Sequence, residues 1–242
     1  MIRLTAFACA TVLATLPATA QDFTEEEIKQ LALQAILENP QIVMEAVSIL
    51  QQREEEEAAA QARTSLEDGR DLLENDPNAP VHGNPEGDVT VVEFFDYNCP
   101  YCRRAGDEVT ALLKGDANVR VVYREWPILG DGSVFAARAA LASRQQGKYV
   151  PFHEALMEAR GRVDERIVMD IAATVGLDID QLRTDMDAPE VQAHIDTSME
   201  LARSLGFSGT PSFVVGDQLA PGLVDAEQLA TMVDATRTGQ TE

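Results

Sequence analysis

Basic residues and cysteine are both scarce in this chain of 242 residues. Lysine and arginine together number 19 against 41 aspartates and glutamates, which gives a formal net charge of −22 at pH 7. A surface with this charge repels the phosphates of nucleic acids and of anionic lipids, so neither is expected as a partner. There are only three cysteines, which leaves little room for a disulfide framework.

The first twenty residues have the pattern of a cleaved secretory signal peptide. Arg3 supplies the positive start, residues 4–16 form a short apolar stretch, and Ala-Thr-Ala at 18–20 matches a signal-peptidase site. We therefore expect residues 1–20 to be removed as the chain crosses the inner membrane into the periplasm. No later stretch is apolar for long enough to span a bilayer, so we expect the mature protein to be soluble. Cys9 leaves with the signal peptide.

Residues 21–67 are predicted to form an N-terminal helical arm. Thr24 and Glu27 are spaced as a capping box, and apolar residues recur at helical spacing on both sides of Pro40, which interrupts the helix. Two interpretations remain open. Either the arm packs on its own domain and continues as a solvated spacer, or its apolar face binds copies of itself and makes a homo-oligomer. Residues 68–87 are rich in glycine and proline and are predicted to be a linker.

Residues 88–242 have the alternating pattern of an α/β domain. Strands are expected at 89–95 and 119–124 with a helix between them, which is a βαβ unit with parallel strands. Residues from about 133 to 206 are predicted to form several helices between the strands of the domain. The domain is expected to end with a strand at 211–215, a return strand at 218–219 and a helix at 226–236.

The two remaining cysteines, Cys99 and Cys102, lie between the first predicted strand and the helix that follows it. The unpaired N–H groups of a first helical turn stabilise an anion, so we expect the pKa of Cys99 to be lowered and Cys99 to be an exposed nucleophile. Cys102 is then the buried thiol that attacks the resulting mixed disulfide. The spacing indicates redox chemistry.

Three other uses of this cysteine pair fit less well. Zinc takes about four ligands, but there is no second cysteine pair and the three histidines are scattered. Covalent haem attachment needs a histidine where Arg103 stands, and a structural disulfide gains little from so short a loop. We therefore expect redox catalysis without a metal or other cofactor.

Two motifs carry a resemblance to a known family. The segment 93–102, EFFDYNCPYC, resembles the active-site segment of the DsbA family of bacterial periplasmic disulfide oxidoreductases, and the segment 209–213, GTPSF, resembles the cis-proline loop of that family. The similarity covers residues from about 81 to 236. It implies a thioredoxin fold with an inserted helical domain, here preceded by the N-terminal arm, which is more similar to the ScsC/Com1-like branch.

Glu93 lies on the first predicted strand between apolar neighbours. Burial there would raise the pKa of its carboxyl and suit it to take the proton from Cys102. The family has a buried acid at this position, which supports a catalytic role. The alternative is a solvated glutamate on an edge strand.

The resemblance also implies a substrate-binding surface around the cysteines. Pro211 would follow a cis peptide bond and lie against the cysteine pair, and Thr210 would offer its backbone to a substrate strand. Pro100 and Tyr101, between the cysteines, belong to the same surface. Tyr101 replaces the histidine of the strongest oxidases in the family, which predicts a less oxidising protein.

These observations predict a periplasmic thiol–disulfide oxidoreductase that forms or isomerises disulfides in unfolded or misfolded secreted proteins. A membrane redox partner would return it to its working state. An arm that oligomerises favours isomerisation, and a monomer favours oxidation. The alternative is an extracytoplasmic chaperone or binding module whose two thiolates hold copper(I).

Overall fold

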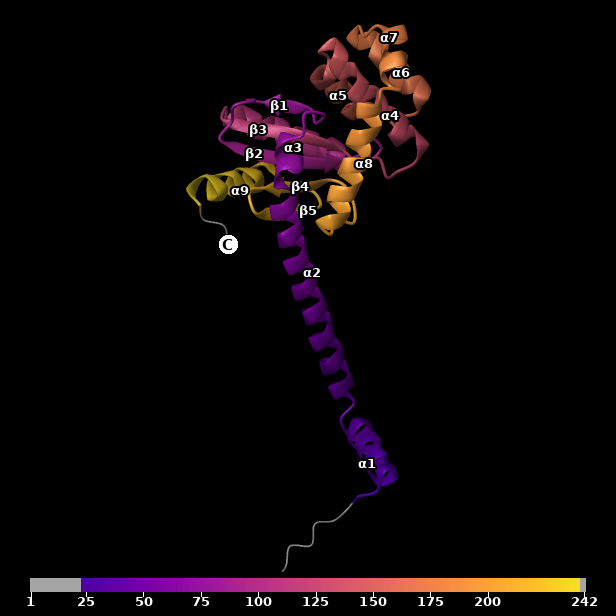
Figure 1. Ribbon diagram of the computed structural model, residues 1–242, viewed down its shortest axis with the longest axis vertical. Coiled ribbons are helices and arrows are strands. Elements are labelled where there is room, and N and C mark those ends of the chain that lie inside the picture. Colours follow the sequence, from indigo (N-terminus) through magenta and orange to yellow (C-terminus); the bar gives the residue numbers. More distant parts are fainter. Residues whose placement is uncertain (1–22, 240–242) are drawn as a thin grey trace, which may run out of the picture. The chain divides into compact units, whose positions relative to one another are not determined.

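The computed structural model describes residues 23–239 and divides into two compact units, with the boundary in the chain between Glu54 and Glu55 (Figure 1). The first unit contains helix α1 (Glu25–Glu38) and the beginning of helix α2 (Gln41–Asn75). The second unit contains all the strands and the other helices. The predicted signal peptide lies outside the described residues.

Helix α1 has the N-terminal cap that the sequence predicts. The side chain of Thr24 accepts a hydrogen bond from the backbone N–H of Glu27, and the Glu27 carboxylate accepts one from the backbone N–H of Thr24 at 2.9 Å. The helix ends before Asn39 and Pro40, as expected for the residue that precedes a proline. None of its residues is buried.

A five-stranded mixed sheet forms the centre of the second unit. Its order is β1-β3-β2-β4-β5, and β2 and β3 pair in parallel as predicted, while the other neighbours are antiparallel. The order puts β2 in the middle. The strands are β1 (Val81–Gly83), β2 (Val89–Phe95), β3 (Val119–Glu125), β4 (Ser212–Val215) and β5 (Gln218–Pro221).

A helical insertion separates β3 from β4, close to the limits expected for it. Figure 1 shows its helices α4 to α7 gathered to one side of the sheet. The helices are α4 (Asp131–Ala142), a 3₁₀ turn (Ser143–Gln146), α5 (Tyr149–Met157), α6 (Glu165–Val175), α7 (Ile179–Asp185) and α8 (Pro189–Ser204). Together with the mixed sheet, this insertion gives the thioredoxin-like α/β fold that the sequence predicts.

Both faces of the sheet are covered, because alternate residues of a strand point to opposite faces. Val91 and Phe95 of β2 pack with helix α3 (Pro100–Gly115), helix α9 (Ala226–Thr238) and much of the insertion. Val92 and Phe94 of the same strand pack with the end of α2 and with α8. Every residue of the central strand except the partly exposed Thr90 is therefore buried, and the strand holds the loop that follows it in place.

The linker predicted at 68–87 is wrong in two places, because α2 continues as a helix to Asn75 and because residues 81–83 form strand β1 of the sheet. Leu66 and Leu73 lie on one face of α2 and are buried against the sheet and α8. Gly69, which suggested a linker, allows this packing: a Cβ atom there would lie 3.1 Å from a methyl group of Leu201 on α8. Gly69 therefore allows α2 and α8 to pack closely, and it does not mark a linker.

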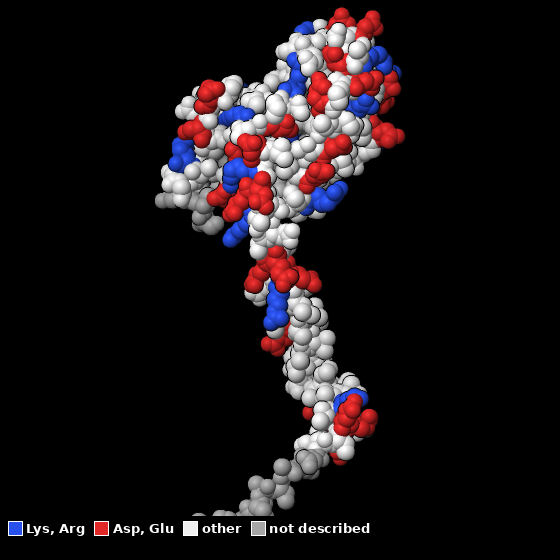
Figure 2. Space-filling model, in the orientation of Figure 1, with Lys and Arg blue, Asp and Glu red and all other residues white. Residues whose placement is uncertain are grey.

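Acidic side chains outnumber basic ones on the visible face of the second unit, in keeping with the composition (Figure 2). Among residues 23–239, no helix is both long enough and apolar enough to cross a membrane.

Candidate active site

The cysteine pair lies where the central strand passes into a helix. Strand β2 ends at Phe95, a three-residue loop follows, and Cys99 is the N-cap of α3 with Pro100 in the first position of the helix. Proline suits that position because its missing N–H would have no partner there. The N–H groups of the first turn are left free to face the sulfur of Cys99.

The surroundings of Cys99 favour its thiolate. A hydrogen bond from Cys102 is the largest cause, and the Thr210 side chain and the backbone N–H groups of Cys102 and Tyr101 add to it; together they outweigh burial and lower the pKa of Cys99 to about 5. The expectation that Cys99 is exposed is wrong, because only 5% of the residue is accessible. The first turn of α3 and the loop at Thr210 lie against it.

Cys102 has the opposite environment. It is completely buried, and burial, followed by its hydrogen bond to Cys99, raises its pKa far above the usual range for a thiol. The backbone N–H of Asp96 lies 3.5 Å from the Cys102 sulfur. One cysteine of the pair is thus a stabilised anion and the other a buried neutral thiol.

Glu93 lies on the central strand β2, so the alternative of a solvated edge-strand glutamate is excluded. Only 1% of the residue is exposed, and its Oε1 has no hydrogen-bond partner among the described residues. Burial raises the pKa of its carboxyl to about 8. The Glu93 charge also raises the pKa of Cys102, so the two groups interact electrostatically.

The loop before β4 closes over the cysteine pair. The Thr210–Pro211 peptide bond is cis, as the resemblance implies, and the Cys99 sulfur lies 3.2 Å from the Thr210 carbonyl oxygen, to which Cys99 donates a hydrogen bond when its thiol is protonated. Of the two residues between the cysteines, Tyr101 is 56% exposed and Pro100 is also exposed. The structure thus brings Cys99, Cys102 and Thr210 together and leaves the intervening pair facing solvent.

The loop from Asp96 to Asn98 holds residues for which no separate role was predicted. Asp96 is buried, and its carboxylate accepts hydrogen bonds from the backbone N–H groups of Ile128, Leu129 and Asn98 at 2.7 to 2.9 Å. The sequence signal was an Asp and an Asn in a turn, where both residue types are common. Their partners lie in distant segments that no local pattern identifies.

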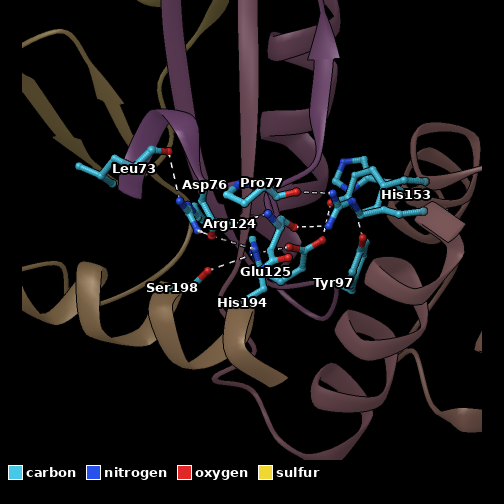
Figure 3. Close-up of polar contacts among 12 residues, drawn as sticks. Leu73, Asp76, Pro77, Tyr97, Arg124, Glu125, His153, His194 and Ser198 are labelled. Carbon is cyan, nitrogen blue, oxygen red and sulfur yellow. Dashed lines mark hydrogen bonds and ion pairs between the residues drawn. The ribbon is translucent and has the colours of Figure 1, made fainter. Parts of the chain in front are cut away.

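A cluster of buried charges lies beside this loop, at the end of β3 (Figure 3). The Arg124 guanidinium donates to Asp76 at 2.7 Å, and the Nε2 atom of His194 lies 2.7 Å from Glu125 Oε2. The Tyr149 hydroxyl donates to the other Glu125 oxygen. The cluster joins the end of α2, strand β3 and helices α5 and α8, so it fixes the insertion to the sheet.

Two further residues near the motif serve the structure. Arg103 donates to the backbone carbonyl oxygens of Tyr97 and Gly161, at 3.3 and 2.6 Å. His153 is 3% exposed, stacks on Tyr123, and its Nδ1 lies 3.1 Å from the Tyr97 hydroxyl. The pKa of His153 is lowered to about 3, mainly because the ring is buried, so the ring is neutral.

A thiolate at a helix N-terminus, a second buried thiol and an adjacent cis-proline loop together form a dithiol–disulfide site. The family model for a DSBA-like thioredoxin domain matches residues 90–234, which includes all of these features. The chain belongs to this family. DsbA-family proteins are thiol–disulfide oxidoreductases, and the family accounts for both the fold and the inserted helices.

Solved structures of related proteins agree with this assignment. A thioredoxin-like oxidoreductase from Silicibacter pomeroyi is 67% identical with a TM-score of 0.69, over 70% of this chain and 98% of the other. A linker-deletion variant of Proteus mirabilis ScsC is 26% identical with a TM-score of 0.69, over 93% of this chain and all of the other. The ScsC similarity extends over more of this chain, as the resemblance to that branch implies.

Curated relatives include the disulfide bond formation protein D of Bacillus subtilis, 25% identical over 192 residues, which are 72% of this chain and 85% of that protein. Other matches are longer proteins. The chain spans about a quarter of the sodium/proton antiporters that it matches first, such as NhaA 1 of Salinispora arenicola, which is 31% identical over 161 residues, 66% of this chain and 25% of the antiporter. For those relatives the similarity concerns only one part of a longer chain.

Proposed function

We propose that this protein exchanges disulfides with unfolded or misfolded secreted proteins in the periplasm through Cys99 and Cys102. The observation that carries the proposal is the opposite environment of the two thiols. The pKa of Cys99 is lowered to about 5, while that of Cys102 is raised. Thiol–disulfide exchange needs an anionic attacking sulfur and a second thiol that displaces it.

In the oxidising direction, a substrate thiolate attacks the Cys99 sulfur of the Cys99–Cys102 disulfide. The sulfur–sulfur bond of the enzyme breaks, a mixed disulfide forms at Cys99, and Cys102 leaves as a thiolate that takes up a proton. A second substrate thiolate then attacks the substrate sulfur of the mixed disulfide and releases Cys99 as a thiolate. Two substrate thiols become one disulfide, and the enzyme gains the two electrons. A membrane redox partner reoxidises it.

In this scheme Glu93 donates a proton to Cys102 or accepts one from it. With a pKa raised to about 8 by burial, its carboxyl is largely protonated near neutral pH and can supply the proton when Cys102 leaves. In the reverse direction its carboxylate takes the proton from the Cys102 thiol. Thr210 and Pro211 hold the substrate backbone beside Cys99, and the exposed Pro100 and Tyr101 form the adjoining surface.

The isomerising direction starts from reduced enzyme. The Cys99 thiolate attacks a wrong substrate disulfide, and a mixed disulfide and a free substrate thiolate form. That thiolate attacks another substrate disulfide, and a substrate thiolate finally displaces Cys99 unchanged, so no net electrons move. Several active sites that face a shared space would favour this reaction, and the first unit supports such an assembly.

We propose that the first unit binds copies of itself. Large apolar side chains of α1 and of the start of α2 are exposed, a surface that single soluble chains rarely leave uncovered. The stretch 39–52 contains a single charged residue, Glu45, and the visible face of this part is mostly uncharged (Figure 2). The exposed set is Phe23, Ile28, Leu31, Leu33, Ile36, Leu37, Ile42, Val43, Met44, Val47, Ile49 and Leu50.

Two assays of the full-length protein, each with a different form of ribonuclease, test the activity. Oxidised protein with reduced ribonuclease measures disulfide formation, and reduced protein with scrambled ribonuclease measures isomerisation. We expect activity in at least one assay, and none in either for Cys99→Ser. Activity that survives in Cys99→Ser would contradict the proposal. Tight binding of copper(I) by reduced protein that is inactive in both assays would support the binding-module alternative.

Light scattering of the full chain tests the assembly. We expect a mass of more than one chain, and a single-chain mass for the double variant Leu31→Lys with Ile42→Lys, which places charges on the exposed apolar surface. A wild-type protein that is monomeric at micromolar concentration would contradict the assembly, and would favour the oxidising direction.

A further inference from the structure

The Asn98 side chain joins the active-site loop to the helical insertion. Its Nδ2 donates to the Val163 carbonyl oxygen at 3.1 Å, and its Oδ1 accepts from the Val163 backbone N–H at 2.7 Å. The same Nδ2 donates to the Ser133 hydroxyl at 3.0 Å. The amide thus pairs with a backbone unit in both directions, which is the hydrogen-bond pattern of a strand pair.

This contact lies next to the nucleophile. Asn98 directly precedes Cys99, and both are held in one tight turn in which the Cys99 N–H donates to the Asp96 carbonyl oxygen at 3.0 Å. The Asp96 side of the turn is fixed by the end of β2 and by three hydrogen bonds to its carboxylate. The Asn98 side is tied by side-chain bonds to the insertion.

The insertion is packed closely at this point. A Cβ atom added to Gly132, at the start of α4, would lie 2.3 Å from the Val163 carbonyl oxygen and 3.5 Å from Asn98 Nδ2. Val163 therefore packs directly against the backbone of α4 at Gly132, where only a glycine fits. A close-packed partner of this kind suits a positioning contact.

We propose that Asn98 is a positioning residue, which lets the helical insertion set the nucleophilicity of Cys99. The thiolate is stabilised first by the hydrogen bond from the Cys102 thiol, and also by the backbone N–H groups of Cys102 and Tyr101; all three groups belong to the first turn of α3 and must point at the Cys99 sulfur, and small changes in the N-cap geometry weaken such bonds. Asn98 holds the N-cap in the orientation in which they do. This inference rests on the proposed function, because it assigns a role within the same site.

Titration of the Cys99 thiolate by its ultraviolet absorbance, in reduced full-length protein, tests the inference. In Asn98→Ala we expect the midpoint to rise by about one pH unit, a tenfold smaller ionisation constant. The matched control is Asp178→Ala, which removes the side-chain cap of α7 in the same insertion and touches no residue of the loop. It should lower the melting temperature but leave the Cys99 midpoint unchanged.

The outcomes separate this inference from the proposed function. A wild-type protein without a low-pH thiolate transition contradicts the proposed function itself. A wild-type transition that is unchanged in Asn98→Ala overturns the positioning role, even if the variant melts earlier. If Asn98→Ala does not fold, Gly132→Ala keeps the Asn98 side chain but displaces Val163. It should shift the midpoint upward, and an unchanged midpoint there also overturns the inference.

Discussion

Two buried glutamates on neighbouring strands, Glu93 of β2 and Glu125 of β3, have opposite surroundings. Only 1% and 0% of these residues are exposed, respectively. The carboxylate of Glu125 accepts a hydrogen bond from Tyr149 and lies 2.7 Å from a ring nitrogen of His194. Glu93 Oε1 has neither a hydrogen bond nor an ion pair among the described residues, and burial raises the pKa of Glu93 to about 8.

The difference shows how a buried glutamate can have either a structural role or an acid–base role. A buried carboxylate with partners on other elements holds those elements together, because removing it leaves the partners unsatisfied. A buried carboxyl without partners is held back from ionising and exchanges its proton near neutral pH, which suits acid–base chemistry. Variants at the two positions should therefore change the free energy of unfolding in opposite directions and by different amounts.

The largest effect is expected for Glu125→Ala. Loss of this carboxylate removes the acceptor of the Tyr149 hydroxyl and the shortest polar contact of the His194 ring in a dry cluster, which should lower the free energy of unfolding by about 3–5 kcal/mol. Denaturant unfolding measures it. Glu200→Ala, on the exposed side of α8, is the control and should change stability by less than about 0.5 kcal/mol. Equal effects of the two variants would contradict a structural role for the cluster.

Above acidic pH, Glu93→Gln should raise the free energy of unfolding, whereas Glu125→Ala lowers it. Because the pKa of Glu93 is raised from 4.5 to about 8, its contribution to stability is complete below pH 4.5 and is lost as pH rises toward 8. Over that window the free energy of unfolding should fall by about 1.4 kcal/mol per pH unit relative to Glu93→Gln. The disulfide form is used, because the titration of the Cys99 thiol would oppose this slope. Parallel pH profiles would show that Glu93 is not held neutral.

The same Glu93→Gln substitution should slow the chemistry at one step. Cys102 would lose its proton acceptor, so its attack on a mixed disulfide at Cys99 should be about a hundredfold slower. The first attack, by the Cys99 thiolate, should keep its rate. Stopped-flow kinetics with a mixed disulfide separate the two steps, and equal slowing of both would contradict the assigned role.

Asp76→Asn should have a smaller effect on stability than either glutamate. Burial acts to raise the pKa of Asp76, but the Asn78 N–H and the Arg124 guanidinium outweigh burial and lower it. We expect a loss of about 2 kcal/mol at neutral pH, because the amide keeps some of the hydrogen bonds. The loss should diminish as pH falls below 3.8, where Asp76 of the unfolded chain takes up a proton, and should vanish once Asp76 of the folded protein, whose pKa is lower, is protonated too. A pH-independent difference would contradict the ion pair.

The smallest effect on stability is expected for Leu31→Lys on α1. The side chain is 52% exposed, so the substitution should change the unfolding of the second unit by less than about 0.5 kcal/mol. Its effect should appear instead in the molar mass. A large stability loss with an unchanged mass would mean that Leu31 packs within the chain.

The strands around the active site could be predicted from sequence because their signals are local. The β-branched and aromatic residues of Val89–Phe95, the capping box at Thr24 and the position of Cys99 at a strand–helix junction are signals that depend on neighbours in the chain. The end of α2 could not be predicted, because a glycine in a helix looks the same whether it ends the helix or allows another helix to approach. Only Leu201, distant in sequence, distinguishes the two cases for Gly69.

The cluster at Glu125 was also beyond reach of the sequence. Its members come from four elements separated by tens of residues, and each one alone looks like an ordinary surface charge. Glu93 was predictable because both its sequence neighbours are apolar. The burial of Cys99 was missed although the resemblance implied that the Thr210–Pro211 loop lies against the cysteines, because how closely a loop covers a side chain depends on packing that no sequence pattern encodes.

The titration of Cys99 in reduced wild-type protein tests the central claim most directly. The account predicts a thiolate that appears with a midpoint near pH 5 and is absent from Cys99→Ser, while Cys102 remains protonated throughout. A midpoint near 9, the ordinary value of a cysteine thiol, would contradict the claim that the start of α3 and the Thr210 loop stabilise a nucleophilic sulfur.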